Sequence, residues 1–327
     1  MTGYVIRRIL WIIPVLWAVA TVTFFLMHAV EGGPFDREKE LPEAVKANLA
    51  AKYNLDKPLV EQYGLFLWNM VEPITYDKVL GVGLGPGKLA GPKLDLGVSF
   101  ENGRQVNTII SEGLTVSVQL GMTAFLYAVV VGMTLGVVAA LNHNRFLDYL
   151  SVFFSTAGTA MPNFIIAVFL VVIFSVQLGW FDVLGWEFGN YRKMVLPIIS
   201  LGTLPAAYIA RITRASVLEV LGQDYIRTAR AKGLQEWVVV LRHTIKNSMV
   251  PILTVMGPIF AFLVTGSFIV ERVFAINGVG RHFVTAIGSR DYGVIMGTTI
   301  FFATVVAFAN LIVDITYAWS DPRIRYK

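Results

Sequence analysis

Residues 115–141 read TVSVQLGMTAFLYAVVVGMTLGVVAAL and contain no charged side chain. A helix needs about 20 apolar residues to cross the hydrocarbon layer of a bilayer, so this stretch is long enough to span one. Five more runs along the chain meet or approach that length: 9–29, 150–178, 195–212, 250–270 and 293–319. The sequence therefore predicts an all-α membrane protein with six transmembrane helices.

The composition agrees with a chain that is surrounded by lipid. Of the 327 residues, 55% are apolar and 15% are charged, against about 25% charged in an ordinary soluble domain. The absence of cysteine excludes disulfides, thiolate metal sites and cysteine nucleophiles. The net charge is +5. In a membrane protein such an excess of basic residues usually lies in the cytoplasmic loops and does not indicate nucleic-acid binding, so no nucleic-acid partner is expected.

The distribution of Lys and Arg predicts the orientation, because these residues are enriched in cytoplasmic loops. With the N-terminus inside, the cytoplasmic segments hold thirteen basic and five acidic residues, whereas the two short outer loops hold five basic and four acidic ones. Both termini are therefore expected in the cytoplasm. The first run is longer than the apolar part of a typical signal peptide and lacks a small-x-small cleavage site, so we expect a retained helix.

This orientation places a long loop, residues 31–108, outside the membrane. Residues 41–55 are expected to form an amphipathic helix with Leu41, Val45, Leu49 and Tyr53 on one face, and residues 62–70 a second helix. The glycine-rich stretch 81–93 is typical of a hairpin or an open loop. Two interpretations stay open for the whole loop: a cap over the outer mouth, or a docking surface for an extracytoplasmic partner.

The predicted spans offer little chemistry for an ion-coupled carrier or an enzyme. Asp314 is the only clear acid in the middle of a span, and it is interpreted first as a paired or hydrated group near the inner surface. The four histidines (His28, His143, His243 and His282) lack metal-ligand spacing. Hydrolase motifs and a Walker A loop are absent, so an ATP-driven protein of this kind needs a second chain to bind the nucleotide.

The most informative stretch is cytoplasmic and covers residues 219–237. Asp224 is predicted to be the N-cap of a short helix over 225–232, and Gly233 to end it in the left-handed conformation. A second helical piece is predicted over 235–247. The short helix carries Arg227, Arg230 and Lys232 on a polar side, with Ile226 and Ala229 opposite. It is either an interfacial helix on anionic lipid or a rigid peg for a cytoplasmic motor.

This stretch resembles the cytoplasmic loop of ABC-importer permeases, whose general pattern is Glu-Ala-Ala, three residues and Gly. Aligned on Gly233, the first three positions hold Arg227, Thr228 and Ala229, and the later Ile-x-Leu-Pro pattern falls on 243–246 without its proline. The sequence Tyr225-x-Arg-Thr-Ala-Arg-Ala-Lys-Gly-Leu instead resembles the variant of the dipeptide, oligopeptide and nickel permeases. Further matching segments occur in order along nearly the whole chain: 4–10, 53–63, 95–100, 160–164, 210–216, 271–281, 290–292 and 321–325.

The resemblance implies a type I ABC importer permease fold and a set of partners. These are a second homologous permease, two cytoplasmic ATPase subunits that bind ATP and Mg²⁺, and an extracytoplasmic solute-binding protein, in a prokaryotic cytoplasmic (inner) membrane. The chain itself would be no enzyme and hold no cofactor. The residues implied in ATPase coupling are Asp224, Tyr225, Arg227, Thr228, Ala229, Arg230, Lys232 and Gly233. Arg227, where the general pattern has Glu, suggests an acidic partner surface.

Pro162 with Asn163 predicts a helix kink and, as an alternative, a gate or pathway lining. Arg211 and Arg214 are expected to anchor the fourth span at the inner interface. The expected organisation is a first span (1–30), an outer loop (31–108) and a core permease domain (109–327) whose coupling loop covers 215–249.

The substrate class is expected to be di- or oligopeptides. Nickel chelates and oligosaccharides are alternatives within the same family, and an ion-coupled secondary carrier and a membrane-embedded enzyme are the alternatives of other classes.

Overall fold

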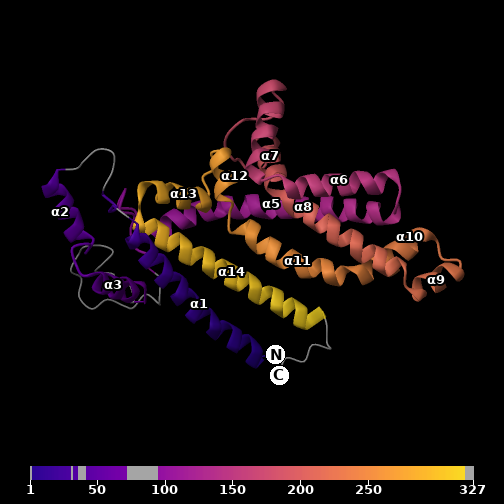
Figure 1. Ribbon diagram of the computed structural model, residues 1–327, viewed down its shortest axis with the longest axis horizontal. Helices are drawn as coiled ribbons and strands as arrows, with labels where there is room; N and C mark the ends of the chain where they lie inside the picture. The colour runs from indigo at the N-terminus through magenta and orange to yellow at the C-terminus, as the bar shows by residue number, and fades with distance from the viewer. Residues whose placement is uncertain (1, 31, 36–41, 72–94, 321–327) are drawn as a thin grey trace. The chain divides into compact units, whose positions relative to one another are not determined.

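The computed structural model describes residues 2–30, 32–35, 42–71 and 95–320. Over these ranges the chain is helical, and its only β pairing is an isolated bridge between Val98 and Gln105. The helices (Figure 1) are α1 (Thr2–Ala29), α2 (Glu43–Lys52), α3 (Leu59–Val71), α5 (Val106–Leu141), α6 (Phe146–Ala160), α7 (Asn163–Leu170), α8 (Tyr191–Leu221), α9 (Asp224–Ala231), α10 (Glu236–Val238), α11 (Lys246–Val264), α12 (Phe268–Val273), α13 (Val279–Ser289) and α14 (Tyr292–Ser320). The chain also has two π-helical segments: Val171–Gln177, which follows α7, and Val239–Ile245, which precedes α11.

Five helical stretches of the described chain are long and apolar enough to cross a membrane: Ile6–Ala29, Val106–Leu141, Tyr191–Leu221, Glu236–Val273 and Tyr292–Ile312. The run 150–178 does not form one straight helix, because α6 and the segment Asn163–Gln177 meet at 106°. Met161 is extended there, as expected for a residue that precedes proline. The kink predicted at Pro162 is confirmed, and a sixth span exists only if the bent pair counts as one.

Several predicted spans are parts of longer helices. α5 begins at Val106, nine residues before the predicted start, and α8 runs from Tyr191 to Leu221 although its apolar run covers only 195–212. Apolar runs mark the part of a helix that is suited to lipid, whereas backbone hydrogen bonding continues into more polar turns. Asp314 lies in α14 at a position where the structure describes the backbone but not the side chain.

Contacts divide the chain into two compact units. The first comprises Met1–Ile12, Leu114–Arg281 and Thr304–Lys327, and the second comprises Ile13–Gly113 and His282–Ala303. The helices α1, α5, α13 and α14 contribute residues to both units.

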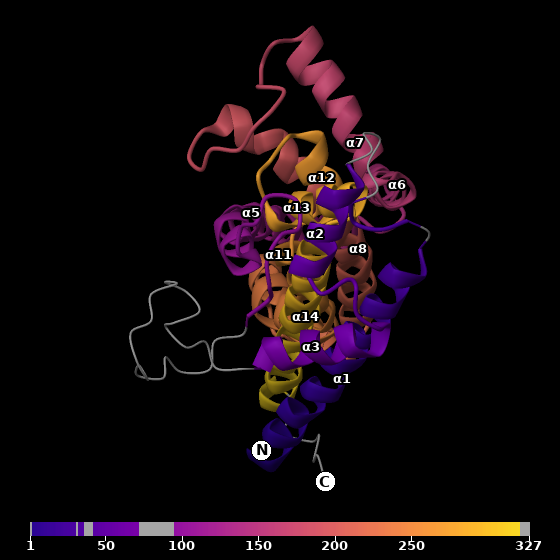
Figure 2. The same ribbon diagram turned by 90° about the vertical axis from the view of Figure 1, so that its left-hand side faces the viewer.

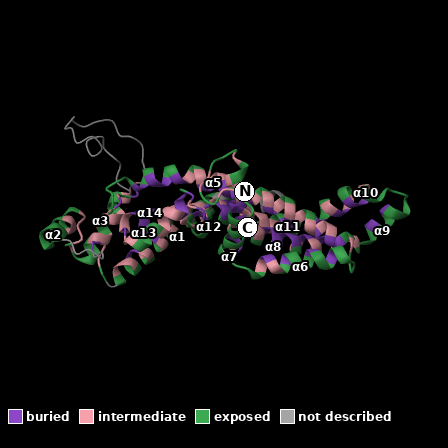
Figure 3. Ribbon diagram, turned by 90° about the horizontal axis from the view of Figure 1, so that it is seen from above, coloured by how far each residue is buried: buried purple, intermediate pink, exposed green. Residues whose placement is uncertain are grey.

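The first unit is built around α8, which packs against α6, α7 and α11. The most apolar part of α8 is 56% buried, the highest value among the candidate spans. Buried residues are purple in Figure 3, where α8 is labelled. Its main core cluster consists of Leu120, Ala124, Ala167, Leu196, Leu201, Leu263, Val270, Phe274 and Ile276.

Small residues allow α5 to lie directly against α8. A Cβ atom on Gly132 would come within 2.6 Å of the backbone oxygen of Ala206, and one on Gly136 equally close to that of Ala210. The two glycines are four residues apart, so they share one face of the helix. In lipid such small residues let helix backbones approach closely and gain van der Waals contact.

The second unit has an aromatic interior and contains α2 and α3, which Figure 2 shows. A ring cluster joins Phe24 of α1, Tyr63 and Phe66 of α3, and a second one joins Tyr53, Phe100 and Tyr292. The helix predicted over 62–70 is confirmed within α3.

The first predicted outer helix is confirmed as α2, which covers Glu43–Lys52 of the predicted range 41–55, but its apolar side chains are not buried. None of the residues of α2 is buried, and Val45 is 43% exposed. Spacing alone predicts which side chains share a face, not whether another element covers that face. Leu41 and the glycine-rich stretch 81–93 lie outside the described residues.

Candidate functional site

The short helix α9 follows α8 after a tight connection. α8 is capped by Gly222, and Gln223 has the extended N-cap conformation. The prediction that Asp224 is the N-cap is therefore wrong by one residue, since Asp224 is the first helical residue. Its exposed carboxylate lies 3.6 Å from Nη1 of Arg227, and an acid in the first turn interacts favourably with the helix dipole.

The buried face of α9 attaches it to the membrane helices. Ile226 is fully buried and Ala229 nearly so, and both pack in a cluster with Val220 of α8 and Val239 of the π-helical segment that precedes α11. The predicted orientation of the two faces is confirmed. Because this contact joins α9 to two longer helices, a force on α9 is transmitted to them through a packed apolar cluster.

The turn after α9 has its own stabilising contacts. Gly233 has φ +77°, the left-handed conformation that glycine adopts without a Cβ penalty, as predicted. The Arg230 guanidinium then reaches across the turn and donates two hydrogen bonds to Glu236, at 3.1 and 2.6 Å. Such a bidentate pair constrains the direction in which α10 leaves the turn.

The second helical piece does not end at Asn247 as predicted. The chain passes from α10 through the π-helical segment into α11 without leaving the helix, and α11 ends at Val264. The turn after α9 is therefore directly continuous with a helical stretch that is long and apolar enough to cross a membrane. The sequence missed this because Lys246 and Asn247 look like the end of a polar segment.

The other face of α9 and the neighbouring turn form an exposed surface with mixed chemistry, which we call the α9 surface. It contains Tyr225, Arg227, Thr228, Lys232, Leu234 and Trp237, all of which are exposed. Trp237 is 62% exposed and Leu234 41%. These two were not among the predicted site residues, although an apolar residue in a polar loop is itself a sign of a contact surface.

The predicted pathway residues lie at the break between α6 and α7. Pro162 is the N-cap of α7, and the backbone oxygen of Asn163 accepts a hydrogen bond from Ser200 Oγ of α8 at 3.1 Å. The side-chain oxygen of Asn163 is buried and has no partner among the described residues. The hydrogen bond from Ser200 thus holds the break against α8, while the side-chain oxygen of Asn163 stays unpaired as far as the described chain extends.

A second buried polar site was not predicted at all. Glu271 of α12 is fully buried, and its carboxyl group accepts hydrogen bonds from Ser117 Oγ and from the backbone N–H of Arg281, both at 2.9 Å. Ser117 Oγ in turn accepts the backbone N–H of Val279 at 2.9 Å. One carboxyl and one hydroxyl group thereby satisfy the first N–H groups of α13, which have no partner within their own helix.

The two arginines near the end of α8 have different environments. Arg214 donates two hydrogen bonds to the buried Asp148 of α6, at 2.6 and 2.9 Å, and His143 Nδ1 lies 3.3 Å from the same carboxylate. Arg211 is exposed. Arg214 therefore ties α6 to α8, whereas Arg211 presents its charge outward.

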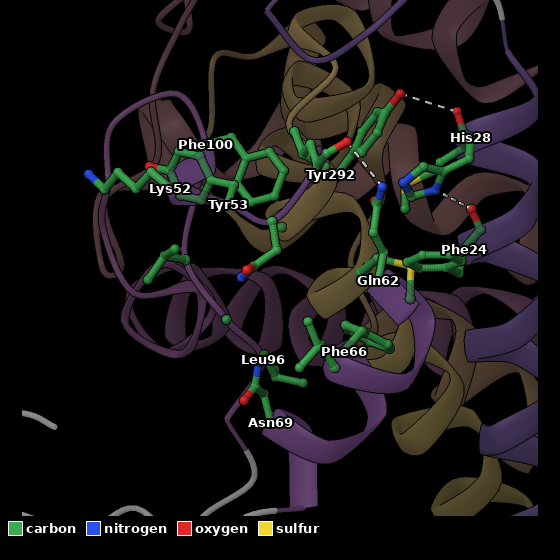
Figure 4. Close-up of a pocket in the computed structure, with 18 residues that line it drawn as sticks. Phe24, His28, Lys52, Tyr53, Gln62, Phe66, Asn69, Leu96, Phe100 and Tyr292 are labelled. Carbon is green, nitrogen blue, oxygen red and sulfur yellow. Dashed lines mark hydrogen bonds between the residues drawn. The ribbon is translucent and has the colours of Figure 1, made fainter. Parts of the chain in front are cut away.

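The second unit contains a cavity of about 230 Å³, shown in Figure 4. At its edge, His28 Nδ1 donates to the backbone oxygen of Phe24 at 2.8 Å, and Lys52 supplies a cationic group. Its other walls are mostly aromatic: Phe24, Tyr53, Phe66, Phe100 and Tyr292. In the part of the chain that the structure describes, no group of three or more His, Cys, Asp or Glu side chains could hold a metal ion.

Comparison with known proteins gives consistent matches. The family model for the binding-protein-dependent transport system inner membrane component matches residues 132–326. The dipeptide transport system permease protein DppB of Bacillus subtilis (strain 168) is 41% identical over 99% of this chain and 98% of its own length. The oligopeptide transport system permease protein OppB of Haemophilus influenzae is 40% identical over 100% of both chains.

A solved structure shares the fold at much lower identity. An inward-facing conformation of the MetNI methionine ABC transporter matches with a TM-score of 0.54 and 18% identity, over 64% of this chain and 95% of the other chain.

Proposed function

We propose a function in peptide import from one premise: the chain belongs to the family of binding-protein-dependent transport system inner membrane components. It is a permease subunit of an ABC importer. The substrate class that we propose is di- and oligopeptides, because full-length relatives at about 40% identity carry the names of dipeptide and oligopeptide permeases.

The proposed topology has six membrane-crossing segments, with the bent pair α6 and α7 as the third. Both termini lie in the cytoplasm, residues 31–108 lie outside, and the chain resides in the cytoplasmic (inner) membrane. The excess of Lys and Arg in the segments assigned to the inside supports this orientation. In the proposed organisation, residues 109–327 form the core permease domain with a coupling loop at 215–249.

The proposed partners are two ATPase subunits, a second permease and a solute-binding protein. The sequence of this chain contains no Walker A loop, and in this proposal two ATPase subunits bind ATP and Mg²⁺. A second homologous permease completes the pathway, and a solute-binding protein delivers the peptide from outside.

Coupling in this proposal runs through α9. The α9 surface sits in a groove of one ATPase, and closure of the ATPases on ATP moves α9 as a rigid body. The apolar cluster around Ile226 passes the movement to α8 and to the helix that continues into α11. Rigid-body rocking between two packed states is an ordinary means of such switching. We also propose that the break at Pro162 and Asn163 takes part in gating, supported by the unpartnered oxygen of Asn163.

Cells that lack this gene and their complemented counterparts test the substrate class. We expect complementation to restore uptake of a labelled tripeptide, but not uptake of nickel or of a maltooligosaccharide. Uptake of nickel or of the oligosaccharide alone would replace the peptide assignment and leave the permease assignment intact.

A further inference from the structure

Arg211 holds a charge for which the described structure shows no protein partner. It lies one turn before Arg214 on α8, but Arg214 is neutralised by two hydrogen bonds to Asp148, whereas neither a hydrogen bond nor an ion pair joins Arg211 to another described residue. A cation that is both exposed and unpaired on a membrane-crossing helix favours an anionic ligand from outside the chain.

The position of Arg211 along α8 places it at a membrane surface. Arg192 and Lys193, near the start of the helix, are paired with Asp182 and Glu187. At 1.5 Å per residue, Lys193 and Arg211 are about 27 Å apart along the helix, close to the thickness of the hydrocarbon layer of about 30 Å. When Lys193 lies at one surface, Arg211 therefore lies at the level of the headgroups on the other.

Arg211 also lines a pocket of about 190 Å³ that is formed by α5, α6 and α8 of the first unit. One part of the wall is apolar and includes Leu135, Ala139 and Val152. The other part carries the hydroxyl groups of Ser151 and Ser155. Each of these hydroxyls donates its proton to a backbone oxygen of α6, at 2.8 Å, so each offers only lone pairs to a ligand.

We propose that this pocket binds the headgroup of an anionic phospholipid, and that phosphatidylglycerol fits it best. The Arg211 guanidinium donates to phosphate oxygens, which it can contact with two N–H groups. The serine oxygens accept hydrogen bonds from the glycerol hydroxyls, and the apolar wall contacts the start of an acyl chain. Free phosphate has no apolar group that could contact the apolar wall. Basic pockets between transmembrane helices are known sites for anionic headgroups.

Native mass spectrometry of the intact transporter tests this assignment after reconstitution in nanodiscs that hold equal amounts of phosphatidylglycerol and phosphatidylcholine. We expect the wild-type protein to retain phosphatidylglycerol in preference to phosphatidylcholine. Arg211→Gln should lower this retention about fivefold, the usual contribution of one basic residue near a membrane surface. Arg211→Lys should keep most of it. Arg192→Gln, the same change at the other end of α8, should leave it unchanged.

Three results would overturn the proposal. The first is equal retention of the two lipids by the wild-type protein. The second is an equal loss of phosphatidylglycerol retention in Arg211→Gln and Arg192→Gln. The third is displacement of the lipid by excess inorganic phosphate, which would identify free phosphate as the ligand. The site does not depend on which solute is transported, so a failed peptide assignment leaves it standing.

Discussion

Replacing Ile226 with Asp should severely lower ATP-driven uptake while the chain remains in the membrane. Ile226 is fully buried between Val220 and Val239, and a carboxylate in that position has no partner. Burying an unpaired charge costs several kcal/mol, and detaching α9 returns the charge to water. We therefore expect α9 to detach and uptake to fall about tenfold or more, measured as labelled peptide accumulated at equal amounts of membrane protein.

A matched variant separates detachment from a simple change of charge. Gln223→Asp introduces the same negative charge three residues earlier, at the exposed N-cap of α9, where Asp is a favourable residue. Uptake by this variant should stay close to that of the wild type. Equal losses in both variants would mean that added negative charge, and not the buried contact, impairs the transporter.

The exposed side of the same helix gives a further test of coupling. Arg227→Glu should lower transport-coupled ATPase activity, because the proposed partner surface is acidic and like charges repel. Arg227→Lys should retain most of that activity. Unchanged activity in Arg227→Glu would contradict an acidic partner at this position.

Glu271→Ala should markedly lower the stability of the folded chain. The carboxyl group accepts hydrogen bonds from Ser117 and from the N–H of Arg281, so its removal leaves buried donors unpaired and also opens a cavity. A buried unsatisfied donor costs about 1–3 kcal/mol, and several together predict a loss of about 3 kcal/mol or more in the free energy of unfolding.

The thermal midpoint of the purified protein in detergent measures this loss. Glu187→Ala is the control, because Glu187 is an exposed carboxylate paired with Lys193, and exposed pairs contribute about 1 kcal/mol or less. An unfolding midpoint for Glu271→Ala as high as that of the control would show that Glu271 is not a structural anchor.

Five of the six predicted long helices, and the short helix α9, were predictable because they depend on local patterns. An uncharged run such as 115–141 is sufficient to predict a membrane helix, and the spacing of Ile226 and Ala229 predicts a shared face whether or not the partner is known. Gly233 was predictable for a similar reason, since a left-handed residue at the end of a helix favours glycine.

The features that were missed depend on contacts between distant segments. Ser117 and Glu271 are far apart in the sequence, and neither residue type alone predicts a buried pair. The bidentate contact between Arg230 and Glu236 depends on the direction of a turn, which a pattern does not give. The exposure of Val45 depends on whether another element covers α2.

The most direct test of the central claim is peptide uptake into proteoliposomes that contain this chain with its partner permease, the ATPases and the solute-binding protein. Our account predicts that uptake requires ATP, continues after an ionophore collapses the proton gradient, and is lost with Ile226→Asp. Uptake that proceeds without ATP and stops when the gradient collapses would contradict it and identify the protein as an ion-coupled carrier.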